Sequence, residues 1–343
     1  MIYRLIRKIL FQFDPEVMHQ VTLRLIGMCG EFAPVAAILH WSYASPPHPV
    51  QLFGLTFPNP IGLAAGYDKD GTGWRGLACL GFGHVEVGTV TPLPQPGNPK
   101  PRIFRIPEAQ ALINRMGFPS HGAQYVARML QKPRPDNLII GVNLGKNKDT
   151  PNEEAAQDYL TLMDTFGALA DYLVINVSSP NTLGLRQLQA RQALDDLLKQ
   201  ISPKREMINA EKHTPLLVKI SPDLSDEELE DVLDILISHH IDGVIATNTT
   251  IQRNGLLPES LVHPSLASQT GGLSGAPLFR LSLSMVEKIV QKAGEQLPVI
   301  GVGGIMDVTQ ARKMLEAGAK LIQVYTGLIY NGPAFVKNLL RSL

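Results

Sequence analysis

The stretch Tyr172-Leu-Val-Ile-Asn-Val-Ser-Ser-Pro-Asn-Thr182 joins an apolar run to a cluster of polar side chains. Its first four residues are typical of a buried strand, and the part 176–182, called the polar loop below, follows where that strand ends. Two asparagines and two serines can each donate or accept hydrogen bonds there, and Pro180 stiffens the turn between them. The polar loop either binds a small polar molecule or is an ordinary turn between a strand and a helix.

Seven other short apolar or β-branched runs follow the same design, because each ends in polar or small residues and leads into a stretch of helical character. The eight expected strands are 61–65, 84–90, 138–144, 172–177, 216–220, 243–247, 299–302 and 321–325. The expected helices between them are 70–80, 153–169, 188–201, 225–239, 281–293 and 308–317. Strands that alternate with helices predict a parallel sheet, and eight of them fit a (β/α)8 barrel, with a doubly wound open sheet as the alternative.

A short N-terminal extension of two helices precedes the barrel. Apolar residues recur at helical spacing from Ile2 to Phe13, and Asp14 followed by Pro15 predicts the cap and first residue of a second helix that stops near Gly30. An amphipathic, basic first helix fits a membrane interface, or it packs on its own domain. We expect residues 1–45 to form this extension and 46–343 the barrel, entered through a hairpin at 51–57 that turns at Gly54.

Composition excludes several classes of protein. The 343 residues hold 31 Lys and Arg against 31 Asp and Glu, so no basic excess indicates a nucleic-acid partner. Cys29 and Cys79 are too far apart to suggest a metal or redox motif, which favours a reducing, cytoplasmic setting. No apolar stretch approaches the ~20 residues needed to span a bilayer, and the N-terminus lacks the pattern of a signal peptide.

In a barrel of this kind the active site lies where the strands end, so the residues that follow the strands are the candidates. Lys69 and Lys219 are the cations expected there, either as ligand-binding groups or as solvated lysines. Since His, Cys, Asp and Glu show no metal-ligand spacing and no strand ends in paired carboxylates, Ser179 is the best candidate for proton transfer. Gly303-Gly304 and Thr326-Gly327 follow the last two strands, where barrels often bind phosphate, and without a third glycine they favour a mononucleotide over a dinucleotide.

The combined motifs resemble the quinone-dependent class 2 dihydroorotate dehydrogenase family in its bacterial form, and the resemblance covers essentially the whole chain. The stretches that carry it are Ala64-Ala-Gly-Tyr-Asp-Lys69, Asn114-Arg-Met-Gly-Phe118, Asn176-Val-Ser-Ser-Pro-Asn181, Thr247-Asn-Thr249, Thr270-Gly-Gly-Leu-Ser-Gly275 and Gly301-Val-Gly-Gly304. The resemblance implies an FMN-dependent oxidoreductase that converts (S)-dihydroorotate to orotate in pyrimidine (UMP) biosynthesis and passes the electrons to a quinone.

The same resemblance implies roles for individual residues. Ser179 would be the base that takes the C5 proton while a hydride leaves C6. Substrate-binding residues would be Lys69, Asn114, Arg115, Met116, Gly117, Phe118, Asn176, Asn181, Asn248 and Thr249. Cofactor-binding residues would be Ala65, Gly66, Tyr67, Asp68, Lys69, Thr89, Asn143, Asn176, Lys219, Thr247, Gly275, Gly304, Tyr325 and Thr326. His19, Arg105 and Tyr325 would lie near the quinone head, and Tyr67 and Leu183 depart from the residues typical of the family.

The resemblance also implies a location. The N-terminal helices would form the quinone entrance of a monomer bound peripherally to the cytoplasmic side of the cell inner membrane. The alternative is a soluble class 1 enzyme that uses fumarate or NAD, but class 1 enzymes use a cysteine base and lack these helices. Two further alternatives stay open, a phosphate-binding barrel lyase or isomerase and a non-catalytic membrane-binding module.

Overall fold

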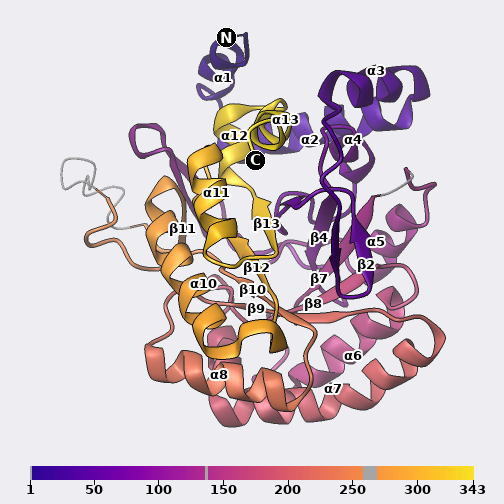
Figure 1. Ribbon diagram of the computed structural model, residues 1–343, viewed down its shortest axis with the longest axis vertical. Coiled ribbons are helices and arrows are strands. Elements are labelled where there is room, and N and C mark those ends of the chain that lie inside the picture. The colour runs from indigo at the N-terminus through magenta and orange to yellow at the C-terminus, as the bar shows by residue number, and fades with distance from the viewer. Residues whose placement is uncertain (1, 136–137, 258–268) are drawn as a thin grey trace.

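The computed structural model describes residues 2–135, 138–257 and 269–343. Its centre is a closed barrel of eight parallel strands, which confirms the expected (β/α)8 architecture and excludes the open sheet (Figure 1). In order around the barrel the strands are β10 (Gly243–Ala246), β12 (Val299–Val302), β13 (Leu321–Val324), β3 (Ile61–Leu63), β4 (His84–Val90), β7 (Ile139–Leu144), β8 (Tyr172–Asn176) and β9 (Leu216–Ile220). The register places Gly88 beside Asn143 and Asn176 beside Lys219, so that polar strand-end residues are neighbours.

Helices surround the barrel. They are α4 (Trp74–Ala78), α5 (Ala123–Leu130), α6 (Ala155–Phe166), α7 (Arg191–Glu211), α8 (Asp226–Ser238), α10 (Phe279–Ala293), α11 (Val308–Glu316), α12 (Thr326–Asn331) and α13 (Phe335–Leu340). Ser225 and Glu228 form a capping box at α8, and the Asp307 side chain caps α11. The helix expected at 70–80 is confined to α4, because the loop before it folds around the Asp68 carboxylate.

Two small sheets lie outside the barrel. The hairpin β1 (Val50–Leu52) and β2 (Leu55–Phe57) turns at Phe53 and Gly54, as expected. A second, three-stranded antiparallel sheet has the order β11 (Gly272–Gly275), β6 (Ala111–Asn114) and β5 (Ile103–Ile106). This sheet was not expected from the sequence, since its strands are far apart in the chain and pair only in three dimensions.

The N-terminal extension contains α1 (Ile2–Leu10), α2 (Pro15–Glu31) and a third helix, α3 (Ala33–Tyr43), which the two-helix expectation omitted. The apolar side chains of α3 show no amphipathic stripe, so periodicity did not indicate it. Helix α2 packs closely on α4 because both carry glycine at the contact. A Cβ atom on Gly30 would lie 2.2 Å from the backbone nitrogen of Gly76, which no real side chain could tolerate.

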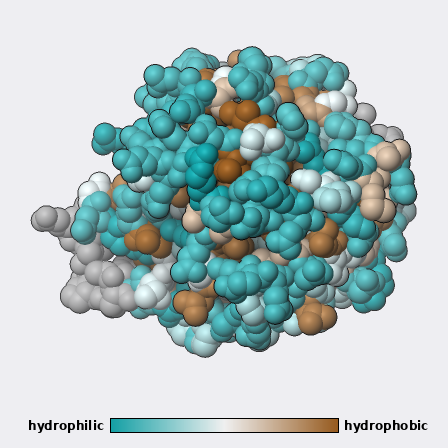
Figure 2. All heavy atoms as spheres, turned by 90° about the horizontal axis from the view of Figure 1, so that it is seen from below, coloured by the Kyte–Doolittle hydropathy of each residue, from teal (hydrophilic) through white to brown (hydrophobic). Residues whose placement is uncertain are grey.

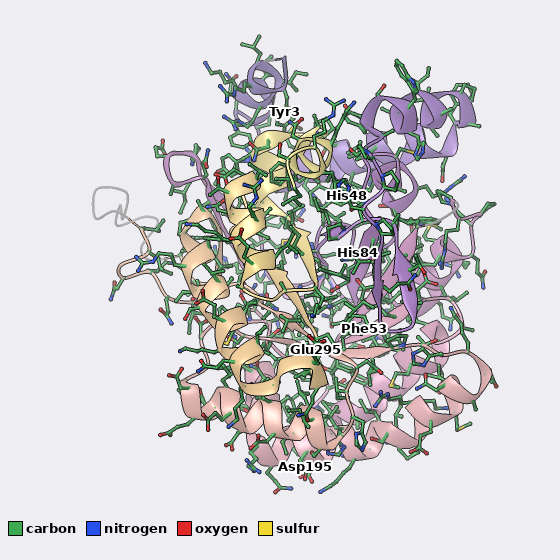
Figure 3. The ribbon with its side chains drawn as sticks, viewed as in Figure 1. Tyr3, His48, Phe53, His84, Asp195 and Glu295 are labelled. Carbon is green, nitrogen blue, oxygen red and sulfur yellow. The ribbon has the colours of Figure 1, made fainter. Side chains whose placement is uncertain are left out.

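The face opposite the extension differs from the extension itself. Seen from below, the molecule is largely hydrophilic with scattered apolar side chains (Figure 2), whereas α2 and α3 expose Met28, Phe32, Ile38 and Trp41. Tyr3 of α1 lies beside α12 and its hydroxyl donates to the Ile329 carbonyl at 2.6 Å (Figure 3). Within the described ranges no single helix is long and apolar enough to cross a bilayer, and only the pair α2 and α3, bent by 104°, passes by length and composition.

Candidate functional site

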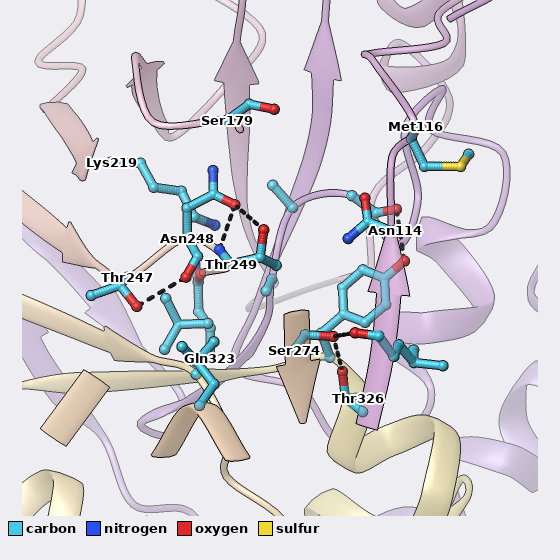
Figure 4. A pocket seen from close by; sticks show the side chains of 18 of the residues that line it. Asn114, Met116, Ser179, Lys219, Thr247, Asn248, Thr249, Ser274, Gln323 and Thr326 are labelled. Atoms are coloured by element: carbon cyan, nitrogen blue, oxygen red, sulfur yellow. Dashed lines mark hydrogen bonds between the residues drawn. The ribbon is translucent and has the colours of Figure 1, made fainter. Parts of the chain in front are cut away.

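A cavity opens at the carboxyl ends of the barrel strands and is covered by the sheet of β5, β6 and β11. Figure 4 shows Lys219, Thr247 and Asn248 on one side of it and Asn114 and Met116 on the other. Of the residues expected from the sequence, those that line it are Ala65, Gly66, Lys69, Thr89, Asn114, Met116, Gly117, Phe118, Asn176, Ser179, Asn181, Lys219, Thr247, Asn248, Thr249, Gly275, Gly304, Tyr325 and Thr326. Segments from most of the chain therefore meet at one place.

A buried chain of hydrogen bonds fixes the amide side chains in this cavity. The Thr89 hydroxyl donates to Asn143 Oδ1 at 2.6 Å, and Asn176 Nδ2 donates to the same oxygen at 2.9 Å. Asn248 Nδ2 donates to Ser178 Oγ at 3.1 Å, while that hydroxyl donates to Asn176 Oδ1 at 3.1 Å. Ser178, which had no expected role, thus joins the two asparagines and fixes which face each amide presents to the cavity.

Below this chain lies a buried carboxylate that sequence reasoning missed. Glu86 is fully buried within β4, and its Oε1 accepts from Asn143 Nδ2 at 2.8 Å while its Oε2 accepts from Gln323 Nε2 at 2.6 Å. The Lys219 ammonium lies 4.0 Å from the same carboxylate. Burial lowers the pKa of Lys219, and Glu86 opposes that shift. The sequence signal that could have identified Glu86 is its position as a lone acidic residue in the apolar run His84-Val-Glu-Val.

Lys69 and Ser179 line the cavity from the loops that follow β3 and β8. Lys69 Nζ donates to the Gly66 carbonyl at 2.6 Å, and although part of its side chain is accessible, desolvation in the cavity lowers its pKa to about 8. Ser179 is 5% exposed, and its Oγ accepts from the Asn181 backbone N–H at 3.2 Å. The hydroxyl proton of Ser179 therefore stays available to a ligand or to a relay.

Asn114 and Asn181 form a pair at the edge of the cavity. Asn181 Nδ2 donates to Asn114 Oδ1 at 3.1 Å, and Asn181 Oδ1 is buried without a hydrogen-bond partner. An unpartnered buried carbonyl is unfavourable, so this oxygen is placed to accept from a bound molecule. Asn98, which the sequence did not single out, holds the pair by donating to the Asn181 carbonyl at 3.0 Å.

Glycines form the far end of the cavity. Gly303, Gly304 and Gly275 have φ angles of 135°, 72° and 96°, and a Cβ on Gly304 would lie 2.4 Å from the backbone nitrogen of Phe279. Only glycine allows the chains to approach this closely. With the hydroxyls of Ser274 and Thr326, which are 2.9 Å apart, these backbones form a polar cradle that fits a phosphate group.

A second cavity of about 320 Å³ lies between the extension and the barrel. Its lining is mostly apolar and includes His19, Tyr67, Arg105 and Tyr325. The ring of Tyr67 lies edge-on between those of His19, at 5.0 Å, and Tyr325, at 5.3 Å. Burial lowers the pKa of His19 to about 4, so the imidazole is neutral at physiological pH. Tyr325 also lines the first cavity, which makes the two cavities neighbours.

Four expected substrate- or cofactor-binding residues do not line the first cavity, and one of them, Tyr67, lines the second cavity instead. The Asp68 carboxylate accepts from the backbone N–H groups of Thr72 and Gly73, both at 2.8 Å, and burial raises its pKa to about 6. Asn143 lies behind Thr89 and Asn176 in the hydrogen-bonded chain. Arg115 turns outward and donates to the Pro101 carbonyl. These three side chains support the loops and strands that line the cavity.

Leu183 is 91% exposed and so lies away from the cavity lining. Among residues 2–135, 138–257 and 269–343 no group of three or more His, Cys, Asp or Glu is arranged to hold a metal ion.

A closed (β/α)8 barrel with amides, two lysines and a glycine cradle at its strand ends defines a barrel enzyme that binds a phosphate-bearing cofactor beside a small polar substrate. The family model described as dihydroorotate dehydrogenase matches residues 49–343. The chain belongs to the dihydroorotate dehydrogenase family, and it is accordingly a flavin-dependent oxidoreductase of pyrimidine biosynthesis.

Named relatives agree over the full length. Proteins called dihydroorotate dehydrogenase (quinone) from Yersinia pseudotuberculosis serotype O:1b (strain IP 31758) and Yersinia pestis are 48% identical, with all of this chain and all of each relative covered. Two crystal structures from Eimeria tenella, a ligand-free dihydroorotate dehydrogenase and a complex with ferulenol, have TM-scores of 0.85 and 40% identity. They cover 96% of this chain, which covers 90% of the ferulenol complex and 93% of the ligand-free chain.

Proposed function

We propose that this chain oxidises (S)-dihydroorotate to orotate through a bound FMN and transfers the electrons to a membrane quinone. The observation that carries the proposal is the pair of adjoining cavities, one polar and one apolar, which share Tyr325. A polar dihydroorotate and an apolar quinone need opposite surroundings but must both reach one cofactor. Quinone in the names of the curated relatives favours this acceptor over fumarate or NAD.

The polar cavity supplies groups for each part of the substrate. The Lys69 ammonium would pair with the carboxylate of dihydroorotate, because it lines the same cavity as Asn114 and Phe118. Asn114, Asn181 and Asn248 would bind the ring, whose N–H and C=O groups alternate as amide side chains require. The buried Asn181 Oδ1 is the acceptor that one ring N–H would satisfy.

Ser179 would remove the proton from C5 of the substrate. A serine hydroxyl is a weak base, so the reaction requires that it accept this proton while passing its own to a neighbouring acceptor. The backbone N–H of Asn181 fixes the Ser179 oxygen. Because Ser179 is buried, bulk water would be excluded from the reacting carbon. The same burial makes the proton transfer depend on a relay within the protein.

The cofactor site fits FMN in its chemistry. Lys219, Thr89 and Asn176 would hold the polar edge of the flavin ring, and the cradle of Gly275, Gly304 and Thr326 would bind its single phosphate. Bound FMN would supply the acceptor for the hydride that leaves C6 and the carrier for its two electrons. Burial lowers the pKa of Lys219, and the Glu86 carboxylate 4.0 Å away opposes that shift.

The apolar cavity and the extension would serve the quinone. His19, which is neutral, Arg105 and Tyr325 would offer polar groups to a quinone carbonyl within mostly apolar walls. The exposed apolar side chains of α2 and α3 would enter the membrane interface, where basic residues of α1 meet anionic headgroups. We propose a monomer bound peripherally to the cytoplasmic side of the inner membrane.

An acceptor panel tests the proposal. Purified protein should show flavin absorbance that bleaches when dihydroorotate is added, and a short-chain quinone should restore it faster than fumarate or NAD. Protein without flavin, or flavin that dihydroorotate does not reduce, would exclude the function. Faster reoxidation by fumarate or NAD would exclude quinone as the acceptor but would leave the oxidation of dihydroorotate in place.

A further inference from the structure

A buried ion pair joins α2 of the extension to the barrel. Glu16 Oε2 accepts from Arg102 Nε at 3.0 Å, and Glu16 Oε1 accepts from Arg102 Nη2 at 2.8 Å. The two side chains are only 5% and 7% exposed. Burial would raise the pKa of Glu16, but Arg102 and Lys100 outweigh it and hold the pKa below its usual value. A guanidinium this deep is tolerated only when paired, so Arg102 depends on a carboxylate from the extension.

Arg102 in turn positions Asn98. Arg102 Nη1 donates to the Asn98 carbonyl at 2.8 Å, on the side away from Glu16. The Asn98 amide donates to the carbonyls of Arg115 and Asn181, both at 3.0 Å. These acceptors belong to the 114–118 segment and to the polar loop, the two parts of the chain that hold Asn114, Ser179 and Asn181 in the cavity. Asn98 is thus a cross-link between them.

We propose that Glu16 is a positioning residue for the dihydroorotate site, because through Arg102 and Asn98 it fixes both segments that border the substrate. This inference rests on the proposed function and adds a second task for the extension. Helix α2 lines the apolar cavity and also completes the polar one. Binding of the polar substrate is thereby coupled to the seating of the membrane-facing helices.

Lys69 adds an electrostatic component to this link. The charged and titratable groups that act on it come from its own loop, from the strand β5 side and from α2, and they are Asp68, Asp70, Arg102, Glu16 and His19. Arg102 lowers the pKa of Lys69 and Glu16 raises it. Loss of the Glu16 charge would leave the Arg102 cation unbalanced. The pKa of Lys69 would then fall further, and the protonated form that binds a carboxylate would be lost at a lower pH.

The test compares Glu16→Gln with Glu31→Gln in the flavin-loaded, full-length protein. Glu31 is a matched control, since it lies on α2 and also forms an ion pair with the barrel, through Lys132, but lines neither cavity. Orotate affinity is measured by titrating the visible absorbance of the flavin at pH 7 and pH 9. We expect the orotate Kd of Glu16→Gln to rise at least about fivefold, the lower end of couplings between sites, and to rise more at pH 9. Glu31→Gln should match the wild type.

A second variant guards against loss of folding. Arg102→Lys keeps a charge for Glu16 but lacks the Nη1 donor to Asn98, so it should fold, retain flavin and still bind orotate more weakly. If Glu16→Gln loses its flavin, the orotate affinity of Arg102→Lys alone tests the inference. Wild-type orotate affinity in the folded variants would overturn the inference. A wild-type flavin that dihydroorotate fails to reduce would instead overturn the proposed function, so the two failures are distinguishable.

Discussion

Single residues in this cavity are understood through the groups that hold them. Asn176 and Asn181 are near one another in sequence, yet each is fixed by a partner from elsewhere: Asn181 by Asn98, and Asn176 by Asn143. The sequence predicted which residues gather here but not these partners. Amide side chains have two donors and one acceptor atom, so their useful orientation is set only by the neighbours that occupy the other groups.

Replacement of Ser179 by alanine tests the proton-transfer role. Ser179→Ala should slow flavin reduction by dihydroorotate by about 10² to 10⁴-fold, the usual contribution of a general base. Flavin content should be unchanged, because the removed hydroxyl accepts only one backbone N–H. Stopped-flow absorbance measures the reduction, with Ser178→Ala as a neighbouring comparison that should disturb binding more than the proton step. A normal reduction rate in Ser179→Ala would show that another group is the base.

The charge of Lys69 makes substrate affinity depend on pH. Its pKa is lowered to about 8, with desolvation as the main cause. Below that pH the ammonium is charged and would bind the substrate carboxylate as proposed, and above it the charge is lost, so we expect the affinity to fall as pH rises through about 8. Bound substrate favours the charged form and moves this loss to a higher pH than in the free protein.

Orotate titrations between pH 6 and pH 10 measure the effect. The affinity of the wild type should decline by about tenfold for each pH unit above the transition, which is the limit for loss of one proton. Lys69→Met should bind weakly throughout and show a flat profile. A flat profile in the wild type would mean that Lys69 does not carry the carboxylate.

At the scale of elements, the helices of the extension have two different surfaces. One packs on the barrel through close contacts such as that of Gly30 with Gly76. The other exposes apolar side chains, of which Trp41 at 80% and Met28 at 65% are the most accessible. Water disfavours such a surface, and the membrane contact that we propose would remove it from water.

Tryptophan fluorescence tests that contact, since the chain has only Trp41 and Trp74. Trp41 is exposed on α3, whereas Trp74 is buried against α5 and its indole donates to the Met129 carbonyl. Vesicles of anionic phospholipid should shift the emission of the protein to shorter wavelength as Trp41 leaves water. Trp41→Phe should remove the shift. The absence of any shift in the wild type at high lipid concentration would contradict membrane contact through α3.

At the scale of the whole molecule, the proposed function assigns one half-reaction to each of the two neighbouring cavities. The polar cavity is built from the barrel strands, and the apolar cavity lies between barrel and extension. Both cavities include Ile103, Leu112 and Tyr325 in their walls. An obstruction placed only in the apolar cavity should therefore affect one half-reaction.

Thr22→Trp provides such an obstruction, because Thr22 lines the apolar cavity on α2. We expect kcat/KM for quinone to fall at least about tenfold, or about 1.4 kcal/mol. Reduction of the flavin by dihydroorotate should stay close to normal. Val21→Trp, on the adjacent exposed face of α2, is the control for the added bulk. Equal loss of both half-reactions in Thr22→Trp would contradict separate sites.

The sequence by itself determined the barrel, the strand ends and most of the residues that line the cavity. Strands that are buried on both faces appear in the sequence as short apolar runs. Because the strands are parallel, their carboxyl ends all lie at the same end of the barrel. Ser179, Lys69 and Lys219 could therefore be placed together before any coordinates. The helix caps of α8 and α11 were equally local, since a cap involves neighbours three residues apart.

Only the tertiary structure decided the features that depend on distant contacts. Glu86 supports Asn143 and Lys219 from within a strand that appeared to be simple core. The β5–β6–β11 sheet and the link from Glu16 through Arg102 to Asn98 join segments separated by up to about 170 residues. Pairing over such distances leaves no periodic trace in the sequence, because it depends on how the barrel closes and on which buried charges need a partner.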